Sequence, residues 1–238
     1  MKPIYLFADS QLLFWKDDDR LFLDSVREQI ERPQPKAAYI GASNGDDPEF
    51  YALFQAAMEG IGINDCCMIT SELSEAEASF LEDADLILLA GGDVQRGWDA
   101  FKKNGVREVV VKRYLEDAVL IGISAGSVQL GWFGWPEGEL APAQLFDTFR
   151  LVPFVVDAHD EKNAWRNLRQ SIQFCGGVVH GIGLPSGGGL IYHTNHTAEA
   201  IRYPAVELFL RSGEIAQSLL MPPGLEASAD VVADNWIT

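Results

Sequence analysis

The chain has 238 residues, 47% of them hydrophobic, and this length suffices for one α/β domain with a large buried core. Acidic residues number 35 and basic residues 18, so the formal net charge is -17 at pH 7. An acidic protein is repelled by polyanions, which argues against a nucleic-acid partner and against binding to an anionic membrane surface.

Three cysteines occur, an odd number without the spacing of a metal site, and the adjacent Cys66 and Cys67 are poorly placed to pair with each other. This cysteine usage fits a reducing cytoplasm. The apolar stretch before Asp9 is too short for a signal peptide, and no segment approaches the length of a membrane span. We therefore expect a cytoplasmic protein without a membrane partner.

Short apolar runs alternate with amphipathic stretches along the first half of the chain. The apolar runs predict strands buried on both faces, at residues 4–8, 37–42, 66–70, 85–90 and 119–123. The stretches between them predict helices at residues 19–30, 47–60, 74–83 and 98–117. Ser74 and Glu77 form a capping box at the start of the third helix. This alternation predicts an α/β fold with a doubly wound, mostly parallel sheet and helices on both faces.

The pattern changes after Pro153. Residues 161–174 predict another helix, and short apolar runs follow at residues 178–184, 189–193, 200–203 and 206–210. Their close spacing predicts an antiparallel C-terminal extension of the same sheet. No linker-like composition separates the two halves, so we expect a single α/β domain over residues 1–238.

A serine lies between two glycines where the fifth predicted strand meets a predicted helix. Residues Gly122 to Gly126 read G-I-S-A-G, the G-x-S-x-G pattern that holds a nucleophile on a sharp strand-to-helix turn. The glycines remove side chains that would clash, which exposes the hydroxyl of Ser124 above the sheet. The same residue types also occur at ordinary strand–helix turns, where the serine is only a small residue.

A second glycine-rich turn follows the fourth predicted strand, in "LLAGGD" at residues 88–93. Ligands of open α/β sheets bind beyond the carboxyl ends of the strands, where both turns are expected to lie. Backbone amides at this turn, together with the amide of Ala125, are candidates for an oxyanion hole. The alternative for Gly91 and Gly92 is a simple tight turn.

A nucleophilic serine needs a base, and the chain has four histidines. His159 follows an apolar run in "VVDAHDEKN", which places it at a strand end and on the same edge as Ser124. His180 falls inside a predicted strand, where packing or surface exposure is the more common role. His193 and His196 flank a turn, but no third metal ligand has a recognisable spacing, so no metal site is expected.

With these motifs, the chain resembles the dipeptidase E (aspartyl dipeptidase) and cyanophycinase family of serine peptidases, whose fold is related to class I glutamine amidotransferases. Four motifs carry the resemblance in the same order: "LLAGGD", "GISAGS", "FDTFRLVPFVVDAHD" and "GIGLPSGG". The resemblance implies Ser124 as nucleophile, His159 as general base, and the amides of Gly92 and Ala125 as the oxyanion hole. It further implies metal-free hydrolysis of a small peptide substrate without a cofactor, by a monomer or a homodimer.

The chain departs from the family in the turn "LPSGGG", where the family carries a carboxylate that orients the histidine and this chain has Ser186. A hydroxyl carries no charge to stabilise the imidazolium, and neutralising the acid of a Ser-His-Asp triad costs on the order of 10⁴ in turnover. Either activity is lower, or another acid serves. The candidate carboxylates are Asp157, Asp160, Glu137, Glu139 and Asp147.

A second departure concerns the substrate. From Tyr114 to Phe149 the chain has no Lys or Arg, so the loop after the nucleophile offers no cation to a substrate carboxylate, and specificity for acidic residues is not expected. Trp132, Phe133 and Trp135 are candidates for the wall of an apolar pocket, or alternatively cover the core.

The sequence is compatible with two other functions. Ser186 at the carboxylate position also suits a binding or regulatory protein that keeps the fold without efficient catalysis. An enzyme like the glutamine amidotransferases is a weaker alternative, because those enzymes use cysteine at the turn where this chain has Ser124.

Overall fold

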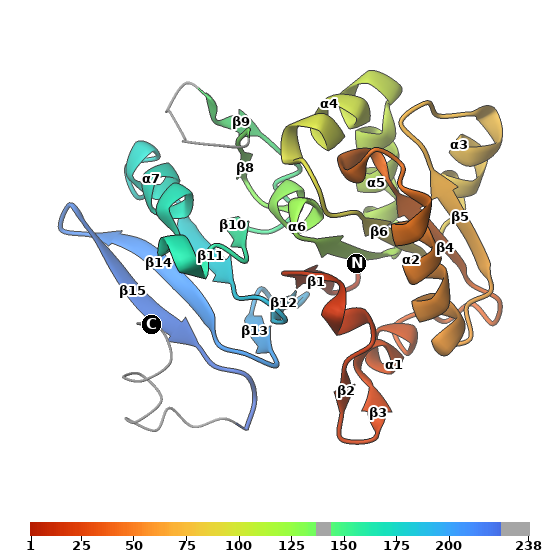
Figure 1. Ribbon diagram of the computed structural model, residues 1–238, viewed down its shortest axis with the longest axis horizontal. Coiled ribbons are helices and arrows are strands. Elements are labelled where there is room, and N and C mark those ends of the chain that lie inside the picture. Colours follow the sequence, from red (N-terminus) through yellow and green to blue (C-terminus); the bar gives the residue numbers. More distant parts are fainter. Residues whose placement is uncertain (137–143, 225–238) are drawn as a thin grey trace.

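The structure, a computed structural model, describes residues 1–136 and 144–224 (Figure 1). Two larger sheets, two short two-stranded sheets and seven α-helices lie in this part of the chain. Of the candidate carboxylates, Glu137 and Glu139 lie outside the described residues.

The larger sheet has seven strands in the order β13-β12-β1-β7-β6-β4-β5. Its parallel strands are β1 (Ile4–Phe7), β4 (Lys36–Ile40), β5 (Asp65–Ile69), β6 (Leu86–Leu89) and β7 (Val119–Ile123). All five were expected from the apolar runs. Strands β12 (Gly189–Tyr192) and β13 (Ala198–Ile201) extend the sheet beyond β1 in antiparallel fashion.

Helices cover both faces of this sheet, as the strand–helix alternation predicts (Figure 1). On one face, α1 (Phe22–Arg27) and α2 (Pro48–Gly60) bury Leu23 and Phe54 against strand residues such as Leu88 and Ile121. On the other face lie α3 (Glu75–Glu82), α4 (Val94–Asn104), α5 (Val106–Leu115) and α6 (Ala125–Leu130). Neighbouring residues of one strand therefore enter two separate hydrophobic cores.

Local signals account for most helix boundaries. The capping box is present at α3, where the Ser74 hydroxyl accepts from the Glu77 amide and the Glu77 carboxylate accepts from the Ser74 amide. The predicted helix at 98–117 is instead two helices, because Gly105 between α4 and α5 adopts φ +70°, a left-handed conformation that ends a helix. The first predicted helix is shortened to α1 by a preceding hairpin of β2 (Lys16–Asp17) and β3 (Arg20–Leu21).

The second sheet has four strands in the order β10-β11-β14-β15. They are β10 (Phe154–Ala158), β11 (His180–Leu184), β14 (Ala205–Arg211) and β15 (Glu214–Leu220). The expected antiparallel extension of the first sheet is thus correct only for β12 and β13. The other runs form a separate sheet in which β10 and β11 are parallel, because a helix connects them as in a βαβ unit.

The helix between β10 and β11 is α7 (Arg166–Phe174). It begins later than the sequence predicts, since Ala164 and Trp165 have positive φ and separate it from a 3-10 turn, η4 (Glu161–Asn163). The helix packs Leu168 and Ile172 onto the outer face of the second sheet.

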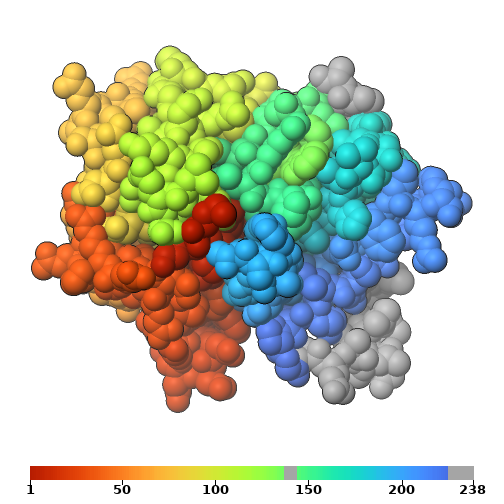
Figure 2. All heavy atoms as spheres, turned by 180° about the vertical axis from the view of Figure 1, so that it is seen from behind, coloured from red at the N-terminus to blue at the C-terminus, as the bar shows by residue number. Residues whose placement is uncertain are grey.

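The inner face of the second sheet joins the core of the first. Val156 and Leu184 belong to the same buried cluster as Leu130 of α6 and Leu190 of β12. Seen from behind, the β12–β13 segment lies between the N-terminal segment and the strands of the second sheet (Figure 2). One continuous hydrophobic core therefore fixes the second sheet relative to the first.

The remaining small elements connect these layers. They are η1 (Ser10–Leu13), η2 (Ala42–Asn44), β8 (Phe133–Gly134) and β9 (Phe146–Asp147), of which β8 and β9 pair with each other. No helix in residues 1–136 and 144–224 has both the length and the apolar character needed to cross a bilayer.

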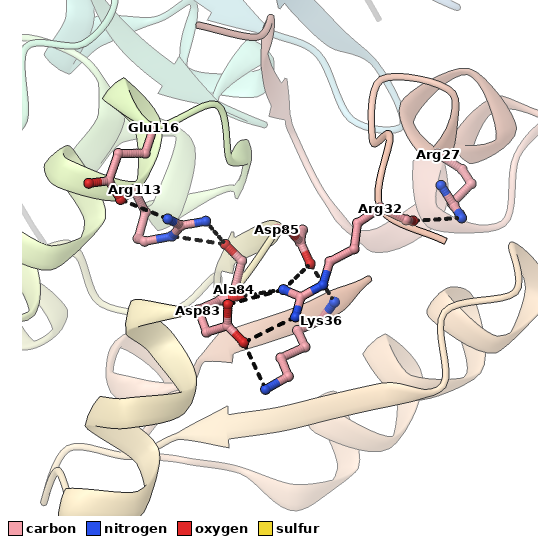
Figure 3. A network of polar contacts seen from close by, with 8 residues as sticks. All are labelled: Arg27, Arg32, Lys36, Asp83, Ala84, Asp85, Arg113 and Glu116. Atoms are coloured by element: carbon pink, nitrogen blue, oxygen red, sulfur yellow. Dashed lines mark hydrogen bonds and ion pairs between the residues drawn. The ribbon is translucent and has the colours of Figure 1, made fainter. Parts of the chain in front are cut away.

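A network of charged side chains ties together the amino-terminal ends of β4 and β6 (Figure 3). The guanidinium of Arg32 bonds to the carboxylates of Asp83 and Asp85, and Lys36 contacts Asp83 at 2.9 Å. Arg113 on α5 donates to the carbonyl of Ala84 at 2.9 Å. This edge of the sheet is opposite to the carboxyl ends of the strands, so the network supports the scaffold from the far side of the expected site.

We expect the network to contribute a small, acid-sensitive part of the stability. Hydrogen bonds from Arg32 and Lys36 lower the pKa of Asp83 to about 2, so its contribution is complete above the unfolded pKa near 3.9 and is lost as pH falls toward 2. Because Asp83 is about half exposed, Asp83→Asn should cost about 1 kcal/mol or less at pH 6. Urea unfolding at pH 6 and pH 2.5 measures the difference, which should shrink at the lower pH. Glu82→Gln is the matched control, and a cost for Asp83→Asn that does not change with pH would contradict the assignment.

Candidate active site

Ser124 occupies a strained turn at the carboxyl end of β7. Its backbone has φ +49° and ψ -108°, a combination that residues with a side chain rarely adopt. The Ser124 amide donates to the Phe7 carbonyl at 2.9 Å, and the buried Ser127 hydroxyl bonds to the carbonyls of Phe7 and Gly122. Hydrogen bonds to the neighbouring strand β1 therefore hold the turn in place.

The two glycines that flank the serine are required by close contacts. A Cβ atom on Gly126 would lie 2.2 Å from the carbonyl oxygen of Leu89 on β6, and one on Gly122 would lie 2.6 Å from the carbonyl carbon of Gly126. Neither distance is possible for a real side chain. The G-x-S-x-G pattern thus marks a turn packed against its own strand and the next one, as the sequence suggested.

The second glycine turn lies beside the serine. Gly92 has φ +123°, and a Cβ atom there would lie 2.3 Å from the Ser43 carbonyl oxygen. A Cβ atom on Gly91 would come within 3.4 Å of the Ser124 Cβ. Both glycines and Ser124 line one pocket, and Ala125 is the first residue of α6, whose amide is not needed within the helix.

His159 reaches the serine from the second sheet. It follows the last residue of β10, has φ +47°, and its amide donates to the Leu184 carbonyl at 2.8 Å. Its Nε2 lies 2.7 Å from Oγ of Ser124, which is hydrogen-bond distance. The two residues that sequence reasoning paired are therefore in contact, although they come from different sheets.

The pocket above Ser124 and His159 has a volume of about 240 Å³ and is mainly apolar. Leu13, Phe50 and Leu53 contribute hydrophobic surface, while Asp9 and Asn44 contribute polar atoms. No Lys or Arg is among the described residues that line it. The pocket is therefore suited to a small ligand with an apolar side chain.

The three aromatic residues expected at the pocket wall lie elsewhere. Trp135, with Trp132 and Phe133 beside it, packs in a separate cluster with Trp165 under α7. The guanidinium of Arg150 lies 5.0 Å from the ring centre of Trp132. Their role in the structure is to cover the core, which was the alternative interpretation.

The carboxylates proposed to orient His159 have other contacts. Asp160 accepts from Asn163 at 2.7 Å, and Asp147 pairs with Arg150. Asp157 is buried, and its Oδ1 accepts the Ala158 amide at 2.9 Å. In the described part of the chain, none of these groups accepts a hydrogen bond from Nδ1 of His159.

Glu161 is a residue of this site that sequence reasoning missed. Its Oε1 accepts the amide of Ser186 at 3.2 Å, and its Oε2 is buried without a hydrogen-bond partner among the described residues. Burial by itself raises the pKa of Glu161, but hydrogen bonds from Ser186 and from its own backbone, together with the charge of His159, lower it below the usual value. Its position two residues after His159 was the one hint in the sequence. The neighbouring residues do not indicate that the turn η4 folds back toward Ser186.

The other histidines do not form a ligand cluster. His180 contacts Glu207 and His193 contacts Glu199, each at 3.2 Å, while His196 contacts the Tyr192 hydroxyl. Within the described residues, no group of three or more His, Cys, Asp or Glu side chains is arranged to hold a metal ion.

Comparisons with known proteins bear on the family and the fold of the chain. The model of peptidase family S51 matches residues 10–200. The crystal structure of a peptidase from an acI-B1 actinobacterium superposes with a TM-score of 0.69 at 14% sequence identity, over 94% of this chain and 95% of that chain. A candidate peptidase E protein from Listeria monocytogenes EGD-e superposes with a TM-score of 0.53 at 16% identity, over 92% and 99%. No curated protein matched the chain in the sequence comparison. At such identities the structural likeness concerns the fold alone.

We expect Asp157 to make the stability fall as pH rises. Burial, followed by the repulsion from Asp160, raises the pKa of Asp157 to about 7. Between the unfolded pKa near 3.9 and this value, the folded state holds a proton that the unfolded state has released, so the free energy of unfolding drops by up to about 4 kcal/mol. Asp157→Asn should remove that drop, as measured by urea unfolding from pH 4 to pH 8. Exposed Asp147→Asn serves as control, and a wild-type pH profile retained by Asp157→Asn would refute the assignment.

Proposed function

Because the chain belongs to peptidase family S51, a family of serine peptidases, we propose that it is a dipeptidase or small-peptide hydrolase with Ser124 as nucleophile and His159 as general base. The observation that carries this proposal is the 2.7 Å contact between Oγ of Ser124 and Nε2 of His159. A serine on a strained turn, bonded to an imidazole at the rim of a pocket, is the arrangement that serine hydrolases need.

The chemistry follows from the atoms at the site. Oγ of Ser124 attacks the carbonyl carbon of the scissile peptide bond while Nε2 of His159 takes the hydroxyl proton. The carbonyl oxygen becomes an oxyanion, which the amides of Gly92 and Ala125 stabilise. His159 then returns the proton to the leaving amine, the C–N bond breaks, and the acyl group stays on Ser124. Water attacks this ester by the same sequence of proton transfers and releases the acid.

The pocket lining supports a substrate with an apolar side chain next to the scissile bond. Leu13, Phe50 and Leu53 offer hydrophobic surface, whereas a substrate carboxylate would be buried near Asp9, and no Lys or Arg among the described lining residues could pair with it. We propose that Leu or Phe at this position is preferred over Asp. We expect the substrate to be small, because the pocket volume of about 240 Å³ is below that of pockets for larger ligands.

The test of the catalytic pair uses two single variants. Ser124→Ala and His159→Ala should each lower kcat/KM on a dipeptide library by about 10³-fold or more, because each removes a group that forms or breaks bonds. Ser124→Ala should also abolish labelling by a serine-directed phosphonate. His196→Ala, at the β12–β13 turn, is the control and should keep full activity. Wild-type protein that neither labels nor cleaves any peptide would favour the binding-protein alternative.

The specificity proposal has its own test. Leu53 is 42% exposed, so Leu53→Arg is tolerated by the fold and places a cation at the pocket rim. The ratio of kcat/KM for Asp-containing over Leu-containing dipeptides should rise about tenfold relative to wild type, because the new guanidinium pairs with the substrate carboxylate. Leu53→Gln controls for side-chain length. Wild-type protein that cleaves Asp-containing dipeptides best would overturn this specificity.

A further inference from the structure

The turn at residues 185–188 lacks the carboxylate that the family resemblance leads one to expect, yet a carboxylate is present beside it. The turn is closed by the Gly188 amide donating to the Pro185 carbonyl at 2.8 Å. Its next two amides each donate to an acid from another part of the chain: Ser186 to Glu161 at 3.2 Å, and Gly187 to Asp9 at 2.7 Å.

Glu161 is also tied to the histidine by chain geometry. His159 has φ +47°, which turns the chain sharply at the end of β10, and η4 begins at Glu161. The Glu161 carboxylate lies within electrostatic range of His159, and one of its oxygens, Oε2, is shielded from solvent without a hydrogen-bond partner in the described residues. A carboxylate oxygen that is shielded from solvent is stabilised by a charged donor, and the His159 imidazole is within electrostatic range of it.

We propose that Glu161 is the positioning residue for His159. Its carboxylate, which is bound to the amide of residue 186, takes the place of the carboxylate expected on the side chain of residue 186. The inference rests on the proposed function, because it assigns the partner of the base in that reaction. Oε1 stays bound to the Ser186 amide, while Oε2 accepts a hydrogen bond from Nδ1–H of the imidazole and does not take the proton itself. Catalytic hydrogen bonds are often long in a free enzyme and shorten when substrate binds.

Other charged groups near the histidine are less suitable. Successive side chains of a strand point to opposite faces of its sheet. Val156 of β10 faces the shared core, so its neighbour Asp157 lies on the opposite face, beneath α7. Asp160 bonds to Asn163, and Asp9 is occupied by the amides of Gln11 and Gly187. Two cations lie close to this turn: Arg202, whose Nη1 is 3.5 Å from the Gly187 carbonyl, and Lys162, which follows Glu161 in η4.

Glu161 does two things for the reaction in this account. An acceptor at Nδ1 fixes the tautomer that leaves Nε2 free to take the Ser124 proton. Its negative charge stabilises the imidazolium that forms after the transfer. Neither effect depends on contact with the substrate, so Glu161 should influence kcat rather than KM.

The primary test compares Glu161→Gln, which removes the charge, with Glu161→Asp, which keeps it. We expect Glu161→Gln to lower kcat by about 10²-fold or more with KM within about threefold of wild type, and Glu161→Asp to recover at least tenfold of that loss. The acidic limb of the kcat/KM profile should move to lower pH in Glu161→Gln, because the imidazole then holds its proton less tightly. Unchanged kcat and an unchanged pH profile would overturn the inference.

Nitrogen NMR of the histidine side chains gives a readout that does not need activity. In Glu161→Gln the titration of the His159 imidazole should move to lower pH. Glu207→Gln is the matched control, since it removes the carboxylate beside His180 at the far end of β11 and should move only the His180 titration. If Ser124→Ala and His159→Ala keep activity, the proposed function fails, while this titration still decides whether Glu161 acts on the imidazole.

Two further variants complete the design. Asp160→Asn tests the neighbouring carboxylate of Asp160: a large loss of kcat in this variant with none in Glu161→Gln would overturn the inference.

The double variant Glu161→Ser with Ser186→Glu moves the carboxylate from residue 161 to residue 186. It replaces Glu161→Gln if that variant fails to fold. Activity within about tenfold of wild type then supports the inference, and a loss greater than about 100-fold overturns it.

Discussion

The site depends on the packing of strand β10 against helix α6. This contact brings His159, at the end of one sheet, to Ser124, at the end of a strand in the other sheet. The backbone fixes it directly: the Trp132 amide donates to the Phe154 carbonyl, and the Leu151 amide donates to the Leu130 carbonyl. Apolar side chains of both sheets fill the space between these elements and form one core. A shift of the second sheet of about 1 Å would separate the serine from its base, and such misplacement is costly in catalysis.

Backbone strain at both ends of the Ser124–His159 contact is the second feature of the site. Both residues have positive φ, which costs about 1–3 kcal/mol for each residue in a sparsely populated region. The surrounding structure holds this strain through the bonds to the carbonyls of Phe7 and Leu184 and through the glycines that let β6, β7 and α6 approach closely. As a result, the Ser124 hydroxyl and the His159 imidazole both project from the carboxyl edge of their sheets toward one pocket.

The charges around the site are unevenly distributed. Asp9 lines the pocket, and Asp160 and Glu161 follow the histidine in the chain, whereas a cluster of basic residues lies in the network at the amino-terminal edge of the first sheet. Negative charge beside a pocket disfavours an acidic ligand. Membership of peptidase family S51 gives the reaction type, and the proposed substrate preference rests on the apolar lining of the pocket.

The sequence alone determined the features that depend on neighbouring residues. Apolar runs located the five parallel strands, Ser74 and Glu77 located a helix start, and the motif order paired Ser124 with His159. Tertiary structure decided what depends on distant contacts. Short apolar runs do not say which sheet they join, so the separate second sheet was missed. The sequence left two roles open for Trp132, Phe133 and Trp135, and the structure shows that they cover the core. Glu161 was missed for the same physical reason: only the left-handed turn at His159 and the pairing of β10 with β11 bring its carboxylate to Ser186.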